Sequence, residues 1–328
     1  MRISIITPAA ARSRNGNRNT ATRWARLLRE LGHRVSVERE WSGGESDLMI
    51  ALHARRSHAS IRRYAERCPE GPLVVALTGT DLYRDIRTDL DAKRSLQLAT
   101  RLVVLQERGA RELAPRLRAK TRVIYQSARS VPRPPPLTSS FEIVVSGHLR
   151  VEKDPFRTAA ALAYLPHESR IRVTHIGAAM SADMSAQARA WMAREPRYRW
   201  LGEVPRWRAL RLLARSRVMV VSSRMEGGAN VVSEALALRV PVIASRIPGN
   251  VGMLGSRYAG YYPVCDERAL ARILSRVERD DAYYRRLHRT CAARAFLVAP
   301  GRERAALGKL VREAAAARNP RKRAKAAG

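Results

Sequence analysis

The sequence predicts an α/β fold of two doubly wound, Rossmann-like domains. Apolar runs of strand length alternate with amphipathic helical stretches, and the alternation restarts after a proline-rich segment, Val131–Leu137. Strands that alternate with helices form parallel sheets with helices on both faces. A chain of 328 residues is also long enough for two domains, each with its own core.

The first half begins with a buried strand at 2–7, followed by a polar loop. Apolar residues then recur at helical spacing from Ala21 to Leu31. Asn19 or Thr20 is the expected cap of this helix and Gly32 its terminator. Further strands are expected at 34–37, 48–52, 73–77, 102–105 and 123–125.

The second half repeats the pattern. Strands are expected at 141–146, 171–176, 218–222 and 240–244, and helices at 155–164, 181–194, 231–238, 267–279, 282–296 and 302–317. Consecutive prolines cannot continue a helix or a central strand, so they mark a linker. The predicted organisation is a first domain at 1–131, a linker at 132–137, a second domain at 138–300, and a C-terminal helix with a basic disordered tail at 301–328.

The charge balance is strongly basic, with 62 Lys+Arg against 29 Asp+Glu and a net charge of +33. The cations are almost all arginines spread along the whole chain, and the one true cluster lies at 320–325. Aromatic residues make up only 5%, and no nucleic-acid-binding motif is visible, so no nucleic-acid partner is expected. A positive field of this kind attracts anionic small molecules.

The cysteines and the hydropathy place the chain among cytoplasmic proteins. Cys68, Cys265 and Cys291 lie far apart, which is typical of reduced thiols and supports neither a disulfide scaffold nor a zinc site. No apolar run is long enough for a transmembrane segment, and the N-terminal apolar run is too short for a signal peptide. The sequence alone leaves the oligomeric state open.

The densest chemistry lies where the strand at 218–222 runs through Glu226, Gly227 and Gly228 into the next helix. The first-turn N–H groups of that helix form an anion site, and the two glycines let backbone approach a phosphate or a sugar. The carboxylates of Glu226 and Glu234 could accept hydrogen bonds from paired sugar hydroxyls. The alternative is an ordinary turn followed by a solvated glutamate.

The pattern S-S-x-x-E-G-G-x-N-x-x-x-E-A, which runs from Ser222 to Ala235 and contains Glu226 and Glu234, resembles the motif of the retaining GT-B glycosyltransferases of family 4. The resemblance implies the GT-B architecture, in which two Rossmann-like domains face each other across a cleft. It also implies that the second domain binds a nucleotide sugar. Glu226 and the amides after it would hold the hexose and its phosphate, and Glu234 would hold the ribose. The donor set carried over here is Glu226, Gly227, Gly228, Asn230 and Glu234.

A second segment supports this resemblance. Residues 144–155 are similar to the family's G-R-L-x-x-x-K-G segment, in which an arginine and a lysine neutralise the diphosphate. Lys153 falls on the lysine position and Gly147 on the glycine. His148 stands where the family has arginine, with Arg150 two residues on, so the second cation is left open between these two. Residues 244–252 resemble the family's glycine-rich loop beside the donor.

The first domain would bind the acceptor. His53 matches the family's histidine in an H-x-x-x-S pattern, which lies near the hexose and the acceptor; the alternative is a histidine satisfied at a strand end. With Lys153 and Glu226 it completes the expected catalytic set. Polar, arginine-rich loops at the strand ends suit a small anion. The expected acceptor residues are Asn15, Gly16, Asn17, Arg18, Arg55, Thr80 and Asp81.

Nearly the whole chain, from Arg2 to about Arg294, resembles the selenosugar synthases of selenoneine biosynthesis (SenB type). The similarity rests on the loops after 7, 52, 77 and 146. It implies transfer of a sugar from UDP-GlcNAc or UDP-glucose to selenophosphate, with a carbon–selenium bond formed. No metal and no cofactor beyond the UDP-sugar substrate are expected. The alternative is a family 4 enzyme with a hydroxyl acceptor, a lipid or a glycan.

Overall fold

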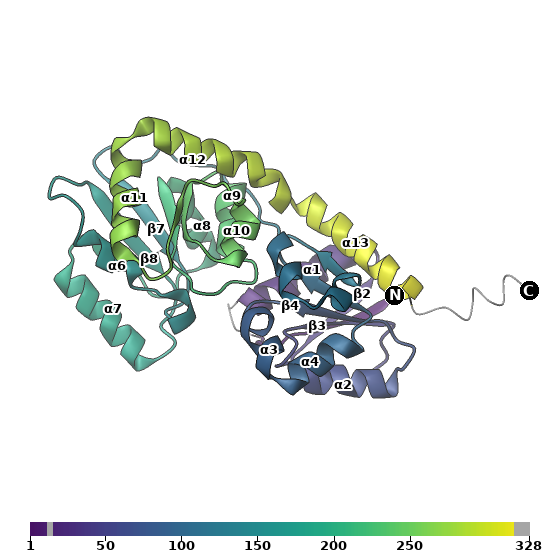
Figure 1. The fold of residues 1–328 in the computed structure, drawn as a ribbon. Coiled ribbons are helices and arrows are strands. Elements are labelled where there is room, and N and C mark those ends of the chain that lie inside the picture. The colour runs from purple at the N-terminus through teal and green to yellow at the C-terminus, as the bar shows by residue number, and fades with distance from the viewer. Residues whose placement is uncertain (12–15, 318–328) are drawn as a thin grey trace, which may run out of the picture. The chain divides into compact units, whose positions relative to one another are not determined.

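The structure is a computed structural model that describes residues 1–11 and 16–317. The chain divides into two compact units. One is Met1–Gln126 together with the C-terminal segment that begins at Pro300, and the other is Ser127–Ala299. Each unit contains one six-stranded sheet in which all neighbouring strands are parallel (Figure 1). The prediction of a doubly wound α/β fold is therefore confirmed.

The sheet of the first unit has the strand order β2-β1-β3-β4-β5-β6. The strands are β1 (Arg2–Ile6), β2 (Arg34–Glu38), β3 (Leu48–Leu52), β4 (Leu73–Leu77), β5 (Arg101–Val104) and β6 (Thr121–Val123). All five residues of β3 and of β4 are buried, which requires cover on both faces of the sheet.

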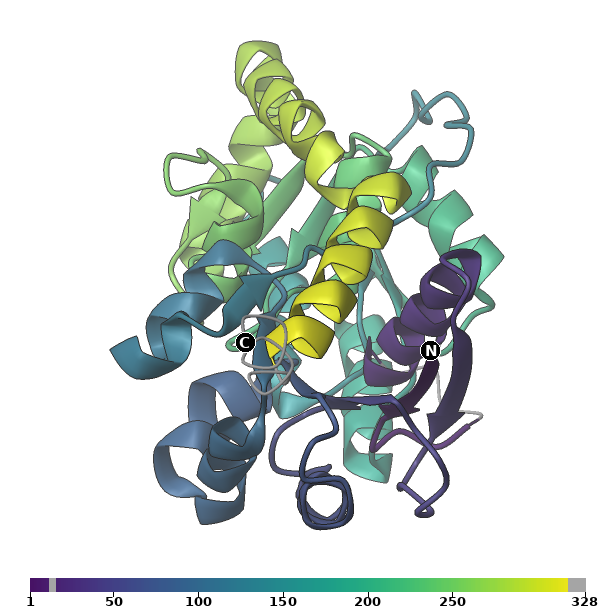
Figure 2. The ribbon, with the colours of Figure 1, turned by 90° about the vertical axis from the view of Figure 1, so that its right-hand side faces the viewer.

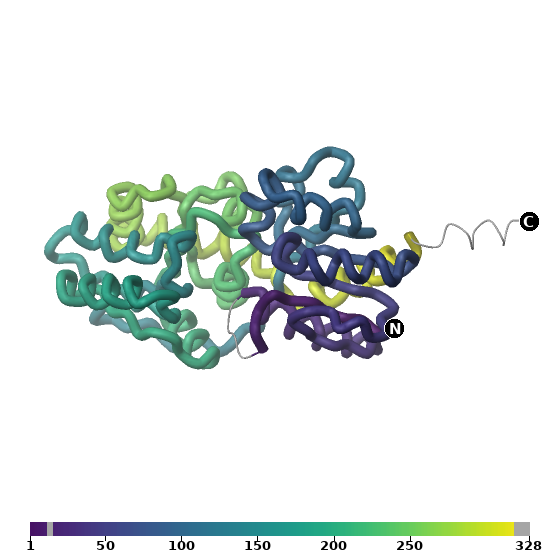
Figure 3. The backbone as a smooth tube through the Cα atoms, turned by 90° about the horizontal axis from the view of Figure 1, so that it is seen from below, coloured from purple at the N-terminus to yellow at the C-terminus, as the bar shows by residue number. Residues whose placement is uncertain are grey.

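Helices cover both faces of this sheet. One core cluster joins its strands to α1 (Gly16–Glu30) and α13 (Pro300–Ala317), and a second joins them to α2 (His58–Arg67) and α4 (Leu90–Leu98). Figures 2 and 3 show α13 in yellow among the purple and blue segments of this unit. The remaining elements are a π-helical turn η1 (Asp81–Asp85), α3 (Ile86–Thr88), a 3₁₀ turn η2 (Glu107–Glu112) and α5 (Pro115–Arg118).

A buried carboxylate fixes α13 to α1. Glu303 is 1% exposed, and its Oε1 accepts the indole N–H of Trp24 at 2.8 Å. Its Oε2 accepts the Nε–H of Arg23 at 2.9 Å. The sequence predicts a separate terminal segment at 301–328, whereas the helical part of that segment, in α13, belongs to the first unit. The basic tail at 318–328 lies outside the described residues.

The second unit has the strand order β12-β11-β10-β7-β8-β9. Its strands are β7 (Phe141–Ser146), β8 (Ile171–Ile176), β9 (Tyr198–Trp200), β10 (Val218–Val221), β11 (Val242–Ser245) and β12 (Tyr261–Tyr262). Its helices are α6 (Arg157–Leu162), α7 (Ala182–Arg194), α8 (Arg206–Arg215), α9 (Asn230–Ala237), α10 (Pro248–Leu254), α11 (Glu267–Arg279) and α12 (Asp281–Arg294). Two 3₁₀ turns, η3 (Val151–Lys153) and η4 (Ala295–Val298), complete the unit.

Some boundaries differ from the sequence prediction. Helix α1 begins at Gly16, so Thr20 is an interior residue and not a cap. Its hydroxyl donates to the carbonyl of Gly16, one turn back, at 2.8 Å, a bond that competes with capping geometry. Strand β6 lies two residues earlier than expected. The helix α8 and the short strands β9 and β12 were not predicted.

No helix among residues 1–11 and 16–317 combines the length and apolar character that crossing a membrane requires.

Replacing Glu303 with alanine should destabilise the first unit by about 3–5 kcal/mol, because it leaves the Arg23 guanidinium and the Trp24 indole N–H buried without their acceptor. Urea unfolding followed by circular dichroism measures this loss. The matched control is Glu30→Ala. Glu30 lies on α1 with its side chain 38% exposed and forms only exposed ion pairs, with Arg26 and with Arg304, so its loss should cost about 0.5–1 kcal/mol. Equal effects of the two variants would contradict the anchoring role of Glu303.

Candidate functional site

The topology fixes where polar side chains gather. In a parallel sheet the carboxyl ends of all strands lie along one edge, and ligands bind where the strand order reverses direction. In the second unit that point lies between β7 and β10, and in the first unit between β1 and β3. The predicted site residues follow these strands and their neighbours, and they form one group in each unit.

In the second unit, Lys153 and Glu226 come together. The Lys153 ammonium forms an ion pair with Oε1 of Glu226, and the Ser223 hydroxyl donates to the same oxygen at 2.6 Å. Glu226 is 8% exposed, so its carboxylate is held in a fixed position. Among the described residues no hydrogen bond of its Oε2 is found. This oxygen can therefore accept a hydrogen bond from a ligand hydroxyl.

The backbone beneath Lys153 is also fixed. The Ser222 hydroxyl contacts the carbonyl oxygens of Lys153 and Asp154 at 2.9 and 2.8 Å. Asp154 adopts a left-handed conformation with φ of +45°, and its carboxylate accepts two hydrogen bonds from Arg157, at 2.8 and 3.3 Å. Those bonds and the nearby Glu267 raise the pKa of the Arg157 guanidinium. Sequence reasoning assigned no role to Asp154 or Ser222, although both lie within the two motif segments.

Gly147 lies against β8. A Cβ on Gly177 would lie 2.0 Å from the Gly147 carbonyl oxygen, so only glycine allows this close approach. The buried His175 has its Nε2 3.2 Å from the same oxygen and its Nδ1 2.8 Å from the Tyr198 hydroxyl. Because a carbonyl only accepts, Nε2 carries the proton. Burial lowers the pKa of His175 to about 4, so the ring is neutral.

The two candidates for the second cation differ in their surroundings. The Nδ1 of His148 accepts the N–H of Ala178 at 3.1 Å, which ties the imidazole to the loop after β8. Arg150 lies beside Glu152, with its Nε 3.6 Å from Oε2. Both side chains are half-buried. Both residues lie in the loop after β7.

The remaining predicted donor residues surround the start of α9. Gly227 and Gly228 precede the helix, and Asn230 is its first residue. Glu234 lies one turn further along, with Oε1 3.0 Å from a guanidinium nitrogen of Arg206 on α8. Sequence reasoning missed this pairing, because nothing in the spacing of the two residues indicates it.

Helix α10 closes on the Glu226 loop. A Cβ on Gly249 would lie 2.0 Å from the carbonyl oxygen of Glu226. The Ser245 hydroxyl donates to the carbonyl of Ser223, and the Asn250 amide donates to the carbonyl of Ser245 at 2.9 Å. The loop after β11, expected to line the donor, therefore packs against the backbone of the segment that carries the Glu226 carboxylate.

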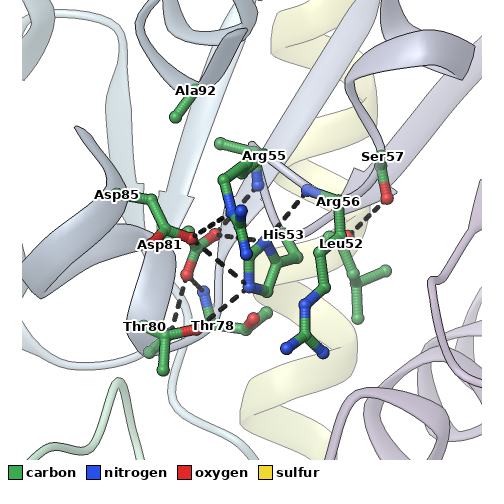
Figure 4. Close-up of polar contacts among 12 residues, drawn as sticks. Leu52, His53, Arg55, Arg56, Ser57, Thr78, Thr80, Asp81, Asp85 and Ala92 are labelled. Carbon is green, nitrogen blue, oxygen red and sulfur yellow. Dashed lines mark hydrogen bonds and ion pairs between the residues drawn. The ribbon is translucent and has the colours of Figure 1, made fainter. Parts of the chain in front are cut away.

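In the first unit, His53 stands directly after β3 (Figure 4). It is 3% exposed and has a φ of +75°, a strained conformation for a residue other than glycine. Its Nδ1 accepts the N–H of Arg56 at 3.3 Å, so Nε2 carries the proton and donates to the Thr80 hydroxyl at 3.0 Å. Burial lowers the pKa of His53, opposed by the nearby carboxylates of Asp81 and Asp85.

Asp81 links the loops after β3 and β4. It is fully buried, and its carboxylate accepts the N–H groups of Ala54, Thr78 and Gly79, each at 2.9 Å. Asp81 was expected to contact an acceptor. Its oxygens are instead used by backbone, which makes it a positioning residue for His53 and Thr80.

Asp85 accepts hydrogen bonds from two arginines. Its Oδ2 accepts the Nε–H of Arg55 at 3.1 Å, and its Oδ1 accepts the Nε–H of Arg84 at 3.0 Å. Figure 4 shows the Arg55 side chain turned toward Asp85. Arg55 was predicted as an acceptor residue, whereas Asp85 and Arg84 were missed. The sequence feature that could have identified Asp85 is its position one helical turn after Asp81.

The other predicted acceptor residues lie at the start of α1. Gly16 is exposed, and Asn17 and Arg18 are half-buried in the first turn. Asn15 lies outside the described residues. Within the described part of the chain, no group of three or more His, Cys, Asp or Glu side chains is arranged to hold a metal ion.

Known proteins resemble this chain in sequence family and in fold. The model of the family described as glycosyl transferases group 1 matches residues 132–325, more than half of the chain. A search of curated proteins found no match. Structures of similar fold include HepE from Anabaena, solved with UDP and glucose, at 15% identity over 95% of this chain and 99% of that one, with a TM-score of 0.76.

Two further structures are similar over almost their whole length. Sucrose-phosphate synthase from Thermosynechococcus elongatus is 17% identical over 96% of this chain and 99% of its own, with a TM-score of 0.78. A glycosyltransferase from Rickettsia africae is 13% identical over 97% and 99%, with a TM-score of 0.70. At these identities the likeness concerns the fold.

The neutral His175 should make stability depend on pH. It binds a proton readily only when unfolded, so its contribution is complete above pH 6.5 and is lost as the pH falls toward 4. Between pH 7.5 and 5 the protein should lose about 2 kcal/mol more than the variant His175→Gln, measured by urea unfolding. The control variant His167→Gln, at an exposed position, should behave like the wild type. The same pH dependence in His175→Gln would refute this role.

Gly249→Ala should destabilise the second unit by about 1–3 kcal/mol, because the added Cβ collides with the Glu226 backbone. Gly301→Ala is the matched control, since nothing lies within 4 Å of a Cβ there. Thermal unfolding compares the two. A Gly249→Ala protein as stable as the control would show that the Glu226 loop is free to move away.

Proposed function

Because the chain belongs to the glycosyl transferases of group 1, we propose that it transfers a hexose from a UDP-sugar to selenophosphate and forms a carbon–selenium bond. Glycosyl transfer follows from the family, and the GT-B fold is that of its structural neighbours. The donor, the acceptor and the residue roles are the proposal. In it, the second unit binds the donor and the first unit binds the acceptor.

The observation that carries the proposal is the shared oxygen of Glu226. Lys153 and Ser223 both use Oε1, which leaves Oε2 to accept a hexose hydroxyl. The flexible lysine stem lets the ammonium move from Glu226 to a diphosphate oxygen once the donor binds. Glu234 would accept the ribose hydroxyls. HepE, whose structures hold UDP and UDP-glucose, supports a UDP-sugar as the donor class.

The chemical step is a substitution at the anomeric carbon. The bond between C1 and the β-phosphate oxygen breaks, and its electron pair leaves on UDP. A selenium lone pair of selenophosphate forms the new C1–Se bond, and no oxidant or reductant is needed. The charge that develops on UDP is met by Lys153, by His148 or Arg150, and by the amides at the start of α9, so the proposed reaction needs no metal.

The state of His53 favours an acceptor that arrives ionised. A hydroxyl acceptor needs a base to take its proton. Both ring nitrogens of His53 are engaged, Nδ1 by the Arg56 N–H and Nε2 by Thr80, so the ring offers no lone pair to a hydroxyl. Selenophosphate carries its nucleophilic charge already. His53, held by Arg56 and Thr80, would then line the hexose site and not remove a proton.

The test is product analysis by mass spectrometry together with UDP release. The enzyme is incubated with UDP-GlcNAc or UDP-glucose and with selenophosphate, thiophosphate, inorganic phosphate or no acceptor. We expect a selenium-containing hexose and UDP release that depends on selenophosphate and is unchanged by EDTA. UDP release that depends on a lipid or glycan alone would overturn the acceptor, and activity restored only by Mn²⁺ would overturn metal independence.

Variants test the donor roles. Glu234→Ala should weaken UDP binding about tenfold or more, because two hydroxyl-to-carboxylate hydrogen bonds are lost. Glu168→Ala is the control, since that side chain is 73% exposed in the same unit and pairs with Arg279. Equal UDP affinity of the two variants, measured by calorimetry, would remove Glu234 from the ribose site.

A further inference from the structure

We propose that Arg55 and Arg84 form an anion clamp for the acceptor and that Asp85 is the residue that positions it. The proposal deepens the proposed function and rests on it for the identity of the acceptor. The clamp lies at the carboxyl edge of the first sheet, since Arg55 follows β3, Arg84 lies in the turn η1 after β4, and these strands are paired neighbours.

The contacts leave the outer edge of each guanidinium available. Both arginines bind Asp85 through Nε, each on a different carboxylate oxygen. Among the described residues, neither guanidinium makes another hydrogen bond. The paired terminal N–H₂ groups of both side chains are therefore free to bind the oxygens of a phosphate-like group, for which a planar fork of donors is suited.

Burial separates the charges into two layers. The side chains of Arg55 and Arg84 are 41% and 50% exposed, whereas that of Asp85 is 5% exposed. The other carboxylate nearby, Asp81, is fully buried and bound to backbone N–H groups. The two guanidinium groups are therefore closer to solvent than the two carboxylates, although the two positive charges balance the two negative ones.

The clamp also lies beside the proposed reaction chemistry. The Nε2 of His53 is 3.9 Å from the Asp85 oxygen that holds Arg55. His53 and the clamp are thus neighbours around Asp85, and an oxyanion held by the two guanidinium groups would lie next to the imidazole edge. The ligand class that fits is a small tetrahedral oxyanion in which a nucleophilic selenium or sulfur replaces one oxygen, such as selenophosphate or thiophosphate.

The substitution Asp85→Asn distinguishes a clamp from general charge attraction, because the two predict opposite effects on anion binding. If only the overall charge attracted anions, Asp85→Asn would strengthen anion binding by removing a negative charge. In a clamp the same change weakens binding. The amide side chain of asparagine has one acceptor oxygen where the carboxylate has two, so it cannot accept from both arginines as Asp85 does. One of the two arginine side chains then loses the hydrogen bond that fixes its position.

The experiment titrates inorganic phosphate into the full chain by calorimetry at constant ionic strength, with saturating UDP to occupy the donor site. We expect Arg84→Ala and Arg55→Ala to weaken phosphate binding about tenfold or more each, Arg84→Lys to restore it only in part, and Asp85→Asn to weaken it. The matched control is Arg87→Ala, an arginine with a 64% exposed side chain that pairs with Glu112. This control should stay within about twofold.

Transfer kinetics with selenophosphate separate the two proposals. The clamp predicts a raised KM for selenophosphate in Arg84→Ala, with the KM for the UDP-sugar unchanged. If the wild type makes the selenosugar and Arg84→Ala is normal in both assays, the clamp is wrong and the proposed function stands. If phosphate binding follows the expected order but no selenosugar forms, the clamp is right and the acceptor has been misidentified. Tighter phosphate binding in Asp85→Asn would overturn the positioning role.

Discussion

The carboxylates that shape both candidate sites are buried, and each must therefore be paired. An ionised carboxylate moved out of water loses several kcal/mol of solvation, which only hydrogen bonds and counter-charges in fixed geometry can offset. Asp81 meets this constraint with three backbone N–H groups, Asp85 with two arginines, and Glu226 with Lys153 and Ser223. Because a partner must lie in place for each charge, the loops at the strand ends have little freedom to move.

The two units use this constraint in the same way. In each, a buried aspartate beyond the end of a strand holds a loop that carries one of the predicted catalytic side chains. Asp154 does so for Lys153 through the shared backbone and Arg157, and Asp81 does so for His53 through the N–H of Ala54. The strained backbone at His53 and the left-handed conformation at Asp154 persist because these bonds fix them. Groups held in advance lose little freedom when a ligand binds, which is why such a site can bind tightly with few contacts.

The sequence predicts the architecture well and the supports of the sites poorly, for a physical reason. Periodicity and glycine placement are local signals, so the strands at 48–52 and 141–146 and the helix at 267–279 are found with their exact bounds. Strand β12 has only two residues, too few to show a period. The pairs Glu303–Trp24 and Arg206–Glu234 join residues that only the folded chain brings together. The motif residues themselves lie where parallel strands end, a position that the strand order dictates.

The arginine excess therefore acts at two different ranges. A net charge of +33 creates a field that steers anions toward the whole surface, but salt screens it beyond about 8–10 Å. Such a field raises encounter rates and cannot distinguish one phosphate-bearing molecule from another. Discrimination needs a cation whose position is fixed, and a long arginine side chain on a surface is not fixed by itself. A buried carboxylate supplies that restraint: Asp85 accepts from Arg55 and Arg84 and so fixes the positions of two side chains among many similar ones. In the proposed clamp, the scarce acidic residues of this chain, more than its abundant basic ones, would thus decide where an anion is bound specifically.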